Sequence, residues 1–225
     1  MTLNSKYPQI GIFIFLFVSL LLLLDQVIKI WVKTHMALGE EFYMLGQPWM
    51  RIHFVENEGM AYGLSFGGEA GKLFLTLFRF GAIGFLIYLM SRLVKAGTRL
   101  GLIIFFSMII AGAIGNLLDS IFYGVIFNSP GYHNGIAILF PPEGGYGSLL
   151  YGKVVDMFYF PLFKFRWPDG IPWIGGQPFE FFRPVFNFAD ACITTGIIGI
   201  LLFYRKDFFQ SEVRDKKVDP SGQVL

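Results

Sequence analysis

Two pairs, each of an amide and an acid, have the residue types and spacing that best suit chemistry. Asn116 precedes Asp119 by three residues, and in a helix this spacing puts both side chains on one face. The same spacing joins Asn187 to Asp190. Two carboxylates that share a proton can activate water with one member and polarise a peptide carbonyl with the other. Such acids suit hydrolysis of a peptide bond without a metal ion.

Three further charged residues lie in apolar stretches of the sequence, as the two amide–acid pairs do. Asp25 precedes Lys29 by four residues, the order that favours an ion pair on a helix, and Arg79 lies in another apolar stretch. Charged groups inside lipid are costly, so each predicts a partner or a function. A structural ion pair explains Asp25 and Lys29 as well as a functional role does. Asp119 and Asp190 favour a function, because the acids outnumber the available bases.

Other kinds of catalytic or binding site find little support. Cys192 is the only cysteine and lies in an apolar run, where an inert buried thiol is favoured over a nucleophile. His35, His53 and His133 are scattered, without zinc-type spacing. The net charge of +2, without a basic run interleaved with aromatics, argues against nucleic acid. The sequence therefore predicts no metal and no other cofactor.

The elements that must position these residues are membrane helices. Of the 225 residues, 54% are hydrophobic and 15% are charged, too apolar a composition for a soluble chain of this length. A membrane span needs about 20 mostly apolar residues. Four stretches qualify, at about 10–31, 73–90, 100–118 and 188–204. No small-residue cleavage site follows the first stretch, so we interpret it as a retained span.

The distribution of lysine and arginine predicts the orientation. The short link after the second span carries Arg92, Lys95 and Arg99 without an acid, and the segment after the fourth span is also basic. Acids dominate the first long connection instead. Because lysine and arginine favour the cytoplasmic side, we expect both termini there. The long connections, 32–70 and 119–187, then face the periplasm or exterior.

Both long connections are expected to fold. The alternation of Met50, Ile52 and Phe54 with polar residues predicts a half-buried strand. A turn follows, and 60–66 is a possible second strand. The connection 119–187 is rich in glycine, proline and aromatic residues, which is typical of a folded cap at the membrane interface.

Five ordered motifs resemble those of the lipoprotein signal peptidases (signal peptidase II). They are Asp25-Gln26-x-x-Lys29, Asn57-Glu58-Gly59-Met60-Ala61-Tyr62, Gly112-Ala113-Ile114-Gly115-Asn116-Leu117-Leu118-Asp119, Val154-Val155-Asp156-Met157-Phe158 and Phe186-Asn187-Phe188-Ala189-Asp190-Ala191-Cys192-Ile193. Each motif alone is a weak signal. Together they stand in the family's order and spread over about 10–205, which makes the resemblance specific.

The resemblance implies a single all-α integral membrane domain over 1–225, with four transmembrane helices, a small extracytoplasmic β-cradle and a lid segment. It implies an aspartyl endopeptidase that removes the signal peptide of diacylglyceryl-modified prolipoproteins, before the lipidated cysteine. Members act at the periplasmic face of the bacterial inner membrane, need no metal and are inhibited by the cyclic peptide globomycin. The site is complete within one chain, so a monomer suffices.

The family's catalytic aspartates correspond to Asp156 and Asp190. Asp190 is also favoured by its position at the outer end of a span, whereas Asp156 lies in a loop by hydropathy and depends mainly on the resemblance. The positions that line or support the site correspond to Asp25, Lys29, Asn57, Gly59, Gly112, Asn116, Asp119 and Asn187.

The chain departs from the family pattern in two places. Ser120 stands where the family usually has arginine, and we expect Arg79 to supply a guanidinium to Asp119 instead. The segments 120–153 and 160–183 are longer than usual in the family. They are either tolerated surface insertions or parts that gate the site or capture substrate.

Two other function classes remain open. A small proton-coupled transporter would place acids near the middle of the membrane and would often repeat one half of its sequence. Here the acids crowd one end of the spans and no half repeats. A non-catalytic membrane scaffold would tolerate the loss of a single carboxylate, which separates it from a peptidase.

Overall fold

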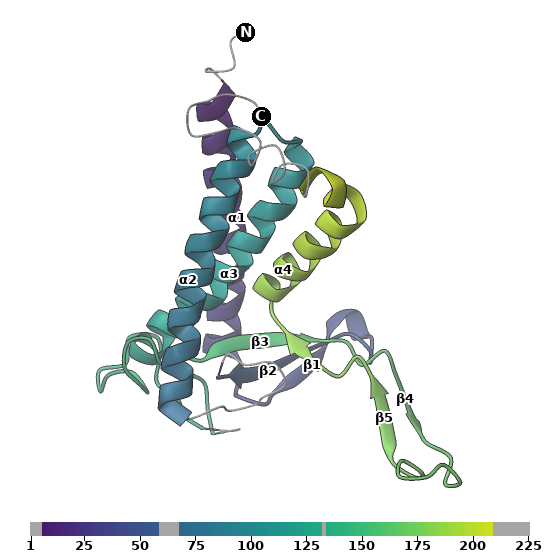
Figure 1. Cartoon of the computed structure of the whole chain (residues 1–225). Coiled ribbons are helices and arrows are strands. Elements are labelled where there is room, and N and C mark those ends of the chain that lie inside the picture. Colours follow the sequence, from purple (N-terminus) through teal and green to yellow (C-terminus); the bar gives the residue numbers. More distant parts are fainter. Residues whose placement is uncertain (1–5, 59–67, 132–133, 209–225) are drawn as a thin grey trace. The chain divides into compact units, whose positions relative to one another are not determined.

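Four long helices dominate the computed structural model, which describes residues 6–58, 68–131 and 134–208 (Figure 1). They are α1 (Lys6–His35), α2 (Gly68–Lys95), α3 (Leu100–Ile126) and α4 (Phe188–Gly199), the last of which continues as a π-helix, η4 (Ile200–Tyr204). Each has the length and apolar composition of a membrane span. The four spans predicted from the sequence are therefore confirmed, and α3 runs eight residues beyond its predicted end.

The strands form two small antiparallel sheets (Figure 1). The larger has the order β1-β2-β3-β6, with strands Glu41–Tyr43, Arg51–Asn57, Val154–Tyr159 and Val185–Phe186. The smaller is a hairpin of β4 (Phe163–Arg166) and β5 (Pro178–Phe181). A single-turn 3-10 helix, η2 (Met44–Gly46), follows β1. Four apolar helices with a small antiparallel sheet confirm the expected fold class.

The strand predictions have different outcomes. β2 confirms the predicted strand around Ile52, whereas the possible strand at 60–66 and the candidate Gly59 lie outside the described residues. Asp156 was expected in a loop, and this expectation was wrong because the residue lies in β3. The first four residues of β3 are all buried, and a short strand buried on both faces has no alternating pattern to reveal it.

The two long segments expected as insertions adopt different structures. The first begins as the end of α3 and continues as an irregular chain, fastened by the isolated bridges Ala37↔Ile136 and Phe127↔Leu139. The second contains the β4–β5 hairpin. The lid segment and the single domain stay predictions.

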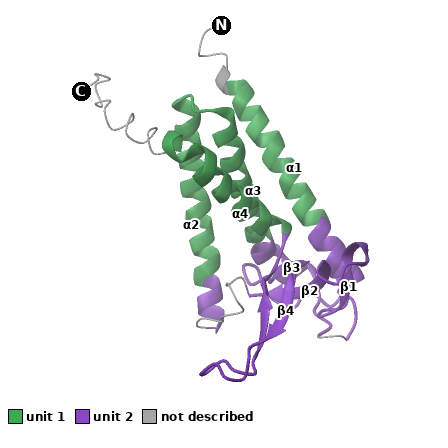
Figure 2. Cartoon of the chain, turned by 90° about the vertical axis from the view of Figure 1, so that its right-hand side faces the viewer, with its two compact units in different colours: residues 1–27, 74–118, 188–225 green, residues 28–73, 119–187 purple. Residues whose placement is uncertain are grey.

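The chain divides into two compact units that alternate along the sequence (Figure 2). One contains 1–27, 74–118 and 188–225, and the other contains 28–73 and 119–187. We call them the helical unit and the sheet unit. Three of the boundaries fall inside α1, α2 and α3.

Close helix packing marks the helical unit. A Cβ at Gly196 would lie 2.6 Å from the backbone oxygen of Phe105, and one at Gly199 would lie 2.3 Å from the Phe105 ring. Only glycine permits this approach of α4 to α3, as small residues do in membrane bundles. Other helix faces expose large apolar side chains, such as Phe15 and Leu202, each 69% exposed. Faces of this kind suit lipid.

The core of the sheet unit joins helix ends to the larger sheet. Val32 and Met36 near the end of α1, Tyr123 in α3 and Met157 in β3 are all buried in one cluster. This packing fixes β3 between the last turns of two helices, and β3 carries Asp156.

Candidate active site

The Asp156 carboxylate is almost fully buried and is held by two amides. Asn57 Nδ2 donates to Asp156 Oδ2 at 3.2 Å, and Asn187 Nδ2 donates to Asp156 Oδ1 at 2.6 Å. Asp156 is 2% exposed and Asn187 is 0% exposed. Because each oxygen accepts a hydrogen bond from an amide, the plane of the carboxylate is fixed before any ligand arrives.

The register of the sheet brings Asn57 to Asp156. Val55 pairs with Asp156 and Asn57 with Val154, so Asn57 and Asp156 are diagonal neighbours on one face of an antiparallel pair. The register shifts between Ile52 and Val55. A one-residue slip exchanges the faces of a strand, so this irregularity decides which face Asn57 occupies.

Asp190 stands in the first turn of α4, in the helical unit. Asn116 Nδ2 in α3 donates to Asp190 Oδ1 at 2.8 Å. The positive end of the helix dipole favours a carboxylate at this position. The sequence placed Asn116 on one helix face with Asp119, whereas this hydrogen bond joins it to Asp190 of another helix.

Asp25 caps the start of α4. Its Oδ1 accepts the backbone N–H of Ala189 at 2.9 Å, one of the donors that a helix leaves unsatisfied at its beginning. Gln26 Nε2 donates to Asp25 Oδ2 at 3.1 Å. A Cβ at Gly112 would lie 2.3 Å from the Ala189 oxygen, and one at Gly115 would lie 2.6 Å from Asp25 Oδ2. Gly112 is required by the close approach of the Ala189 backbone, and Gly115 leaves room for the Asp25 carboxylate.

Asp119 is held in a different way. Its Oδ2 lies 2.8 Å from Lys29 Nζ, and both side chains are 0% exposed. The same oxygen accepts the Val155 N–H at 3.3 Å, so Asp119 ties α3 to the strand of Asp156. Lys29 thus supplies a cation to Asp119. The expected contact from Arg79, a half-buried residue of α2, stays a prediction.

The structure contains a second buried ion pair that the sequence did not predict. Lys33 Nζ binds Glu56 Oε1, and the two side chains are 1% and 5% exposed. The ammonium also lies over the rings of Phe54, Phe127 and Tyr146, with centroid distances between 5.2 and 5.9 Å. The signal that could have found it is Lys33 itself, four residues after Lys29 on the same helical face.

Gly152 was also missed. A Cβ there would lie 2.0 Å from the backbone oxygen of Asp119, so the chain can pass α3 at this point only with glycine. The Gly152 N–H donates to the Ser120 oxygen at 2.8 Å. This contact fixes the chain directly before β3.

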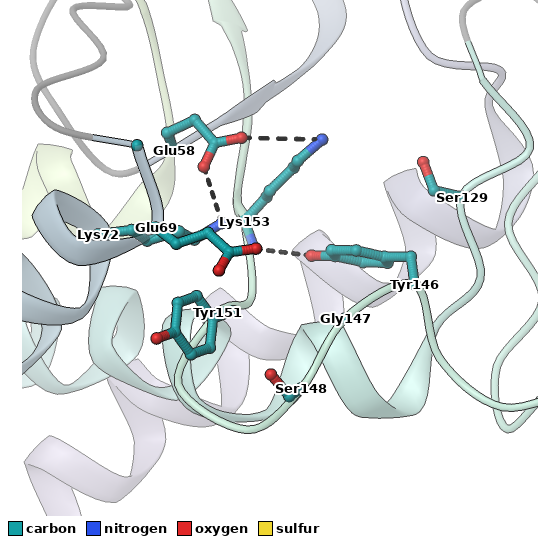
Figure 3. A pocket seen from close by; sticks show the side chains of 10 residues that line it. Glu58, Glu69, Lys72, Ser129, Tyr146, Gly147, Ser148, Tyr151 and Lys153 are labelled. Carbon is teal, nitrogen blue, oxygen red and sulfur yellow. Dashed lines mark hydrogen bonds and ion pairs between the residues drawn. The ribbon is translucent and has the colours of Figure 1, made fainter.

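A polar cavity of about 870 Å³ lies beyond the ends of β2 and β3 in the sheet unit (Figure 3). Glu58, next after Asn57, forms an ion pair with Lys72 at 2.8 Å and approaches Lys153 at 3.9 Å. Tyr146 lines the cavity, and burial raises the pKa of its hydroxyl well above the usual range. The Tyr146 oxygen accepts the Lys153 N–H at 2.6 Å.

The structure thus places the candidate residues in two clusters. Asp25, Gly112, Asn116 and Asp190 gather in the helical unit, at the start of α4. The cluster of the sheet unit surrounds β3 and contains Lys29, Asn57, Asp119, Asp156 and Asn187. Within the described ranges, no three histidine, cysteine, aspartate or glutamate side chains are grouped as a metal site requires.

The sequence of this chain is similar to those of known proteins. The family described as signal peptidase (SPase) II matches residues 17–205. The lipoprotein signal peptidase of Porphyromonas gingivalis is 53% identical over 201 residues, covering 89% of this chain and 85% of its own. That of Amoebophilus asiaticus is 36% identical over 194 residues, covering 85% and 77%.

Solved structures agree on the fold. A bacterial membrane enzyme superposes with a TM-score of 0.55 at 24% identity, covering 92% of this chain and 94% of its own. A second one gives 0.53 at 24% identity, with 86% and 93% covered. The multi-pass helices, the small sheet and the extent of the sequence match lead to one assignment. The chain belongs to the signal peptidase II family, aspartic peptidases that remove signal peptides from prolipoproteins.

Proposed function

We propose that Asp156 and Asp190 are the catalytic pair, and that the bond cleaved lies before the lipidated cysteine of diacylglyceryl-modified prolipoproteins. The hydrogen bonds to these two acids carry the proposal. Amide groups of Asn57, Asn187 and Asn116 donate them. A neutral amide orients a carboxyl group in either protonation state, whereas the buried Lys29 beside Asp119 favours the ionised form alone.

The mechanism divides two roles between the pair. One carboxylate, ionised, takes a proton from the attacking water. The other, protonated, polarises the scissile carbonyl and then gives its proton to the leaving amine. Two acids that share a proton titrate as a unit, so the pH profile of cleavage belongs to the pair. Asn57 and Asn187 keep one of these acids in its reactive orientation.

The membrane context defines how the substrate arrives. The signal segment is apolar and the cysteine carries acyl chains, so the substrate enters sideways from the bilayer. The basic link after α2 supports cytoplasmic termini and a site on the periplasmic face of a bacterial inner membrane. We further propose that a monomer is active and that globomycin inhibits it.

Conservative variants test the pair. We expect Asp156→Asn and Asp190→Asn each to lower kcat at least about 100-fold, because general acid–base catalysis contributes that much or more. The assay follows cleavage of a diacylglyceryl-modified prolipoprotein in vesicles. Glu41→Gln, which changes an exposed carboxylate of β1, is the matched control. Normal cleavage by either folded aspartate variant would refute the assignment, and it is also the outcome that a scaffold predicts.

The polar cavity suits the residues that follow the lipidated cysteine, since these are the polar part of the substrate near the scissile bond. Lys153 lines the cavity and lies three residues before Asp156, about 10 Å along the strand. Ser148→Trp, which fills the cavity, should raise KM for a full-length prolipoprotein and leave a substrate cut short after the cysteine unaffected. Ser91→Trp, on an exposed turn of α2, is the control. Equal effects on both substrates would contradict this role.

A further inference from the structure

The β4–β5 hairpin is an exposed element with two unlike faces. Its register pairs Phe163 with Phe181 and Phe165 with Phe179, so these four rings share one face. Lys164 pairs with Glu180, and both project from the opposite face. A two-stranded hairpin is at best marginally stable in water, so it needs a further surface to bury its apolar side.

The aromatic face is continuous and open. Phe163 stacks on Phe181 with ring centroids 4.8 Å apart, and Phe165 lies 4.9 Å from Phe179. Trp167 extends the cluster, 4.9 Å from Phe165. Phe163 is 51% exposed, Phe165 40% and Phe181 44%. The rings thus form an ordered apolar surface in which three of the five rings are exposed and two are half-buried.

The tip presents one more ring. Trp173 is 95% exposed, and its backbone has a φ of 64°, a left-handed conformation that is unfavourable for a large side chain. The turn is closed by the Gly176 N–H, which donates to the Trp167 oxygen at 3.0 Å, and Gln177 Nε2 donates to the Trp173 oxygen at 3.0 Å. Hydrogen bonds therefore hold an unfavourable conformation that exposes a tryptophan.

Cations accompany the rings. Lys164 and Arg166 are exposed on the face opposite the aromatic cluster, and Arg183 is exposed two residues after β5. Glu180 is engaged by Lys164 at 3.1 Å and by the Tyr159 hydroxyl. Tryptophan and phenylalanine on one side with lysine and arginine on the other is the composition of elements that lie in the membrane interface.

We propose that the hairpin lies in the interfacial layer of the bilayer. Its aromatic face and Trp173 enter the region between headgroups and acyl chains, and its cations face the lipid phosphates. This inference goes beyond the proposed function, since it requires neither catalytic aspartate.

Chain connectivity favours lipid over a protein as the occupant of this surface. β5 ends at Phe181, and the membrane span α4 begins at Phe188. Seven residue steps reach at most about 25 Å, so Phe181, at the base of the hairpin, stays within that distance of the first residue of the span. A lipid surface is thus within reach of the hairpin through this short connection.

Tryptophan fluorescence tests the proposal in the full-length chain. The protein has four tryptophans, and replacing Trp31, Trp49 and Trp167 by Phe leaves Trp173 as the reporter. In phosphatidylglycerol-containing vesicles, lipids with brominated acyl chains should quench Trp173 strongly, and acrylamide should quench it weakly. A variant that keeps only Trp31, which is 47% exposed on the span α1, is the reference for a ring in lipid.

Two double variants test which face of the hairpin contacts the lipid. Phe163→Ser with Phe181→Ser should reduce quenching of Trp173 by brominated lipid. The same two changes in the variant that keeps only Trp31 should leave the quenching of Trp31 constant. Lys164→Gln with Glu180→Gln, on the opposite face, is the matched control and should retain most of it. Full quenching after loss of the two phenylalanines would overturn the proposal. Free access of acrylamide to Trp173, or shielding from both quenchers by a protein, would overturn it as well.

Discussion

At the residue scale, the hydrogen-bond partners of Asp156 and Asp190 differ from those of Asp119. Asp156 and Asp190 accept from asparagine side chains, whereas Asp119 faces a lysine that is itself fully buried. Breaking a buried ion pair is costly, because the remaining group loses the interaction that offset its burial. Asp119 accepts the N–H of Val155, next to Asp156 in β3, so we propose that it is a positioning residue.

The buried pair predicts a stability defect. Lys29→Met or Asp119→Asn alone should lower the free energy of unfolding by about 3–5 kcal/mol, because one charge loses its partner. Lys29→Met combined with Asp119→Leu should recover part of the loss. Thermal denaturation in detergent, together with the cleavage assay, measures both effects. An Asp119→Asn protein of normal stability but without activity would instead make Asp119 catalytic.

Gly115 gives a sharper test of how the start of α4 is set. A Cβ there would lie 2.6 Å from Asp25 Oδ2, so Gly115→Ala should push Asp25 away from the Ala189 N–H. Loss of a helix cap costs about 1 kcal/mol, and the displaced first turn of α4 should lower kcat. Gly84→Ala in α2 meets nothing within 4 Å and is the control. Equal kcat in the two variants would contradict the role given to Asp25.

At the element scale, β2 was predictable and β3 was not. The alternation around Ile52 reports one buried and one open face, and this pattern is local. Val154 to Met157 are buried on both faces by helix ends far away in the sequence. No local pattern distinguishes such a strand from an apolar loop. Asp156 was therefore found by family resemblance rather than by its surroundings.

The contact between β3 and the hairpin carries a pH prediction. Burial and the hydrogen bond to Glu180 raise the pKa of Tyr159 to about 12. Burial alone raises the pKa of Glu180, but hydrogen bonds from Tyr159 and Lys164 outweigh it and leave that pKa below its usual 4.5.

Both pKa shifts favour the hydrogen bond between Tyr159 and Glu180 at pH values between 4.5 and 10. The contribution of Glu180 is present above pH 4.5 and is lost as the pH falls through its lowered pKa. That of Tyr159 is present below pH 10 and is lost between pH 10 and about 12. Trp167 packs against Phe165 and Phe179 of the same hairpin, so its fluorescence should report on this contact. It should stay constant at intermediate pH and change at both acidic and alkaline pH. In Tyr159→Phe the alkaline change should vanish, and its persistence would contradict the assignment.

At the scale of the whole molecule, hydropathy and length sufficed for the four spans, because a membrane helix is a local property of about 20 residues. The contacts that build the two clusters are not local. Asp25 and Ala189 are 164 residues apart, and Asn116 and Asp190 are 74 apart. The spacing in the sequence placed these groups at corresponding ends of the spans and suggested local partners, such as Lys29 for Asp25, but not these distant ones.

The positions of the basic residues predict the orientation of the molecule in the membrane, and this prediction can be tested directly. The link between α2 and α3 contains lysine and arginine without an acid, so it should remain in the cytoplasm. In a Cys192→Ala background, a membrane-impermeant maleimide should label Glu143→Cys in intact spheroplasts. It should label Lys95→Cys only after the membrane is opened. Both positions are exposed, so access to the reagent depends on the side of the membrane alone. The reverse labelling pattern would place the termini outside and the carboxylates at the cytoplasmic face.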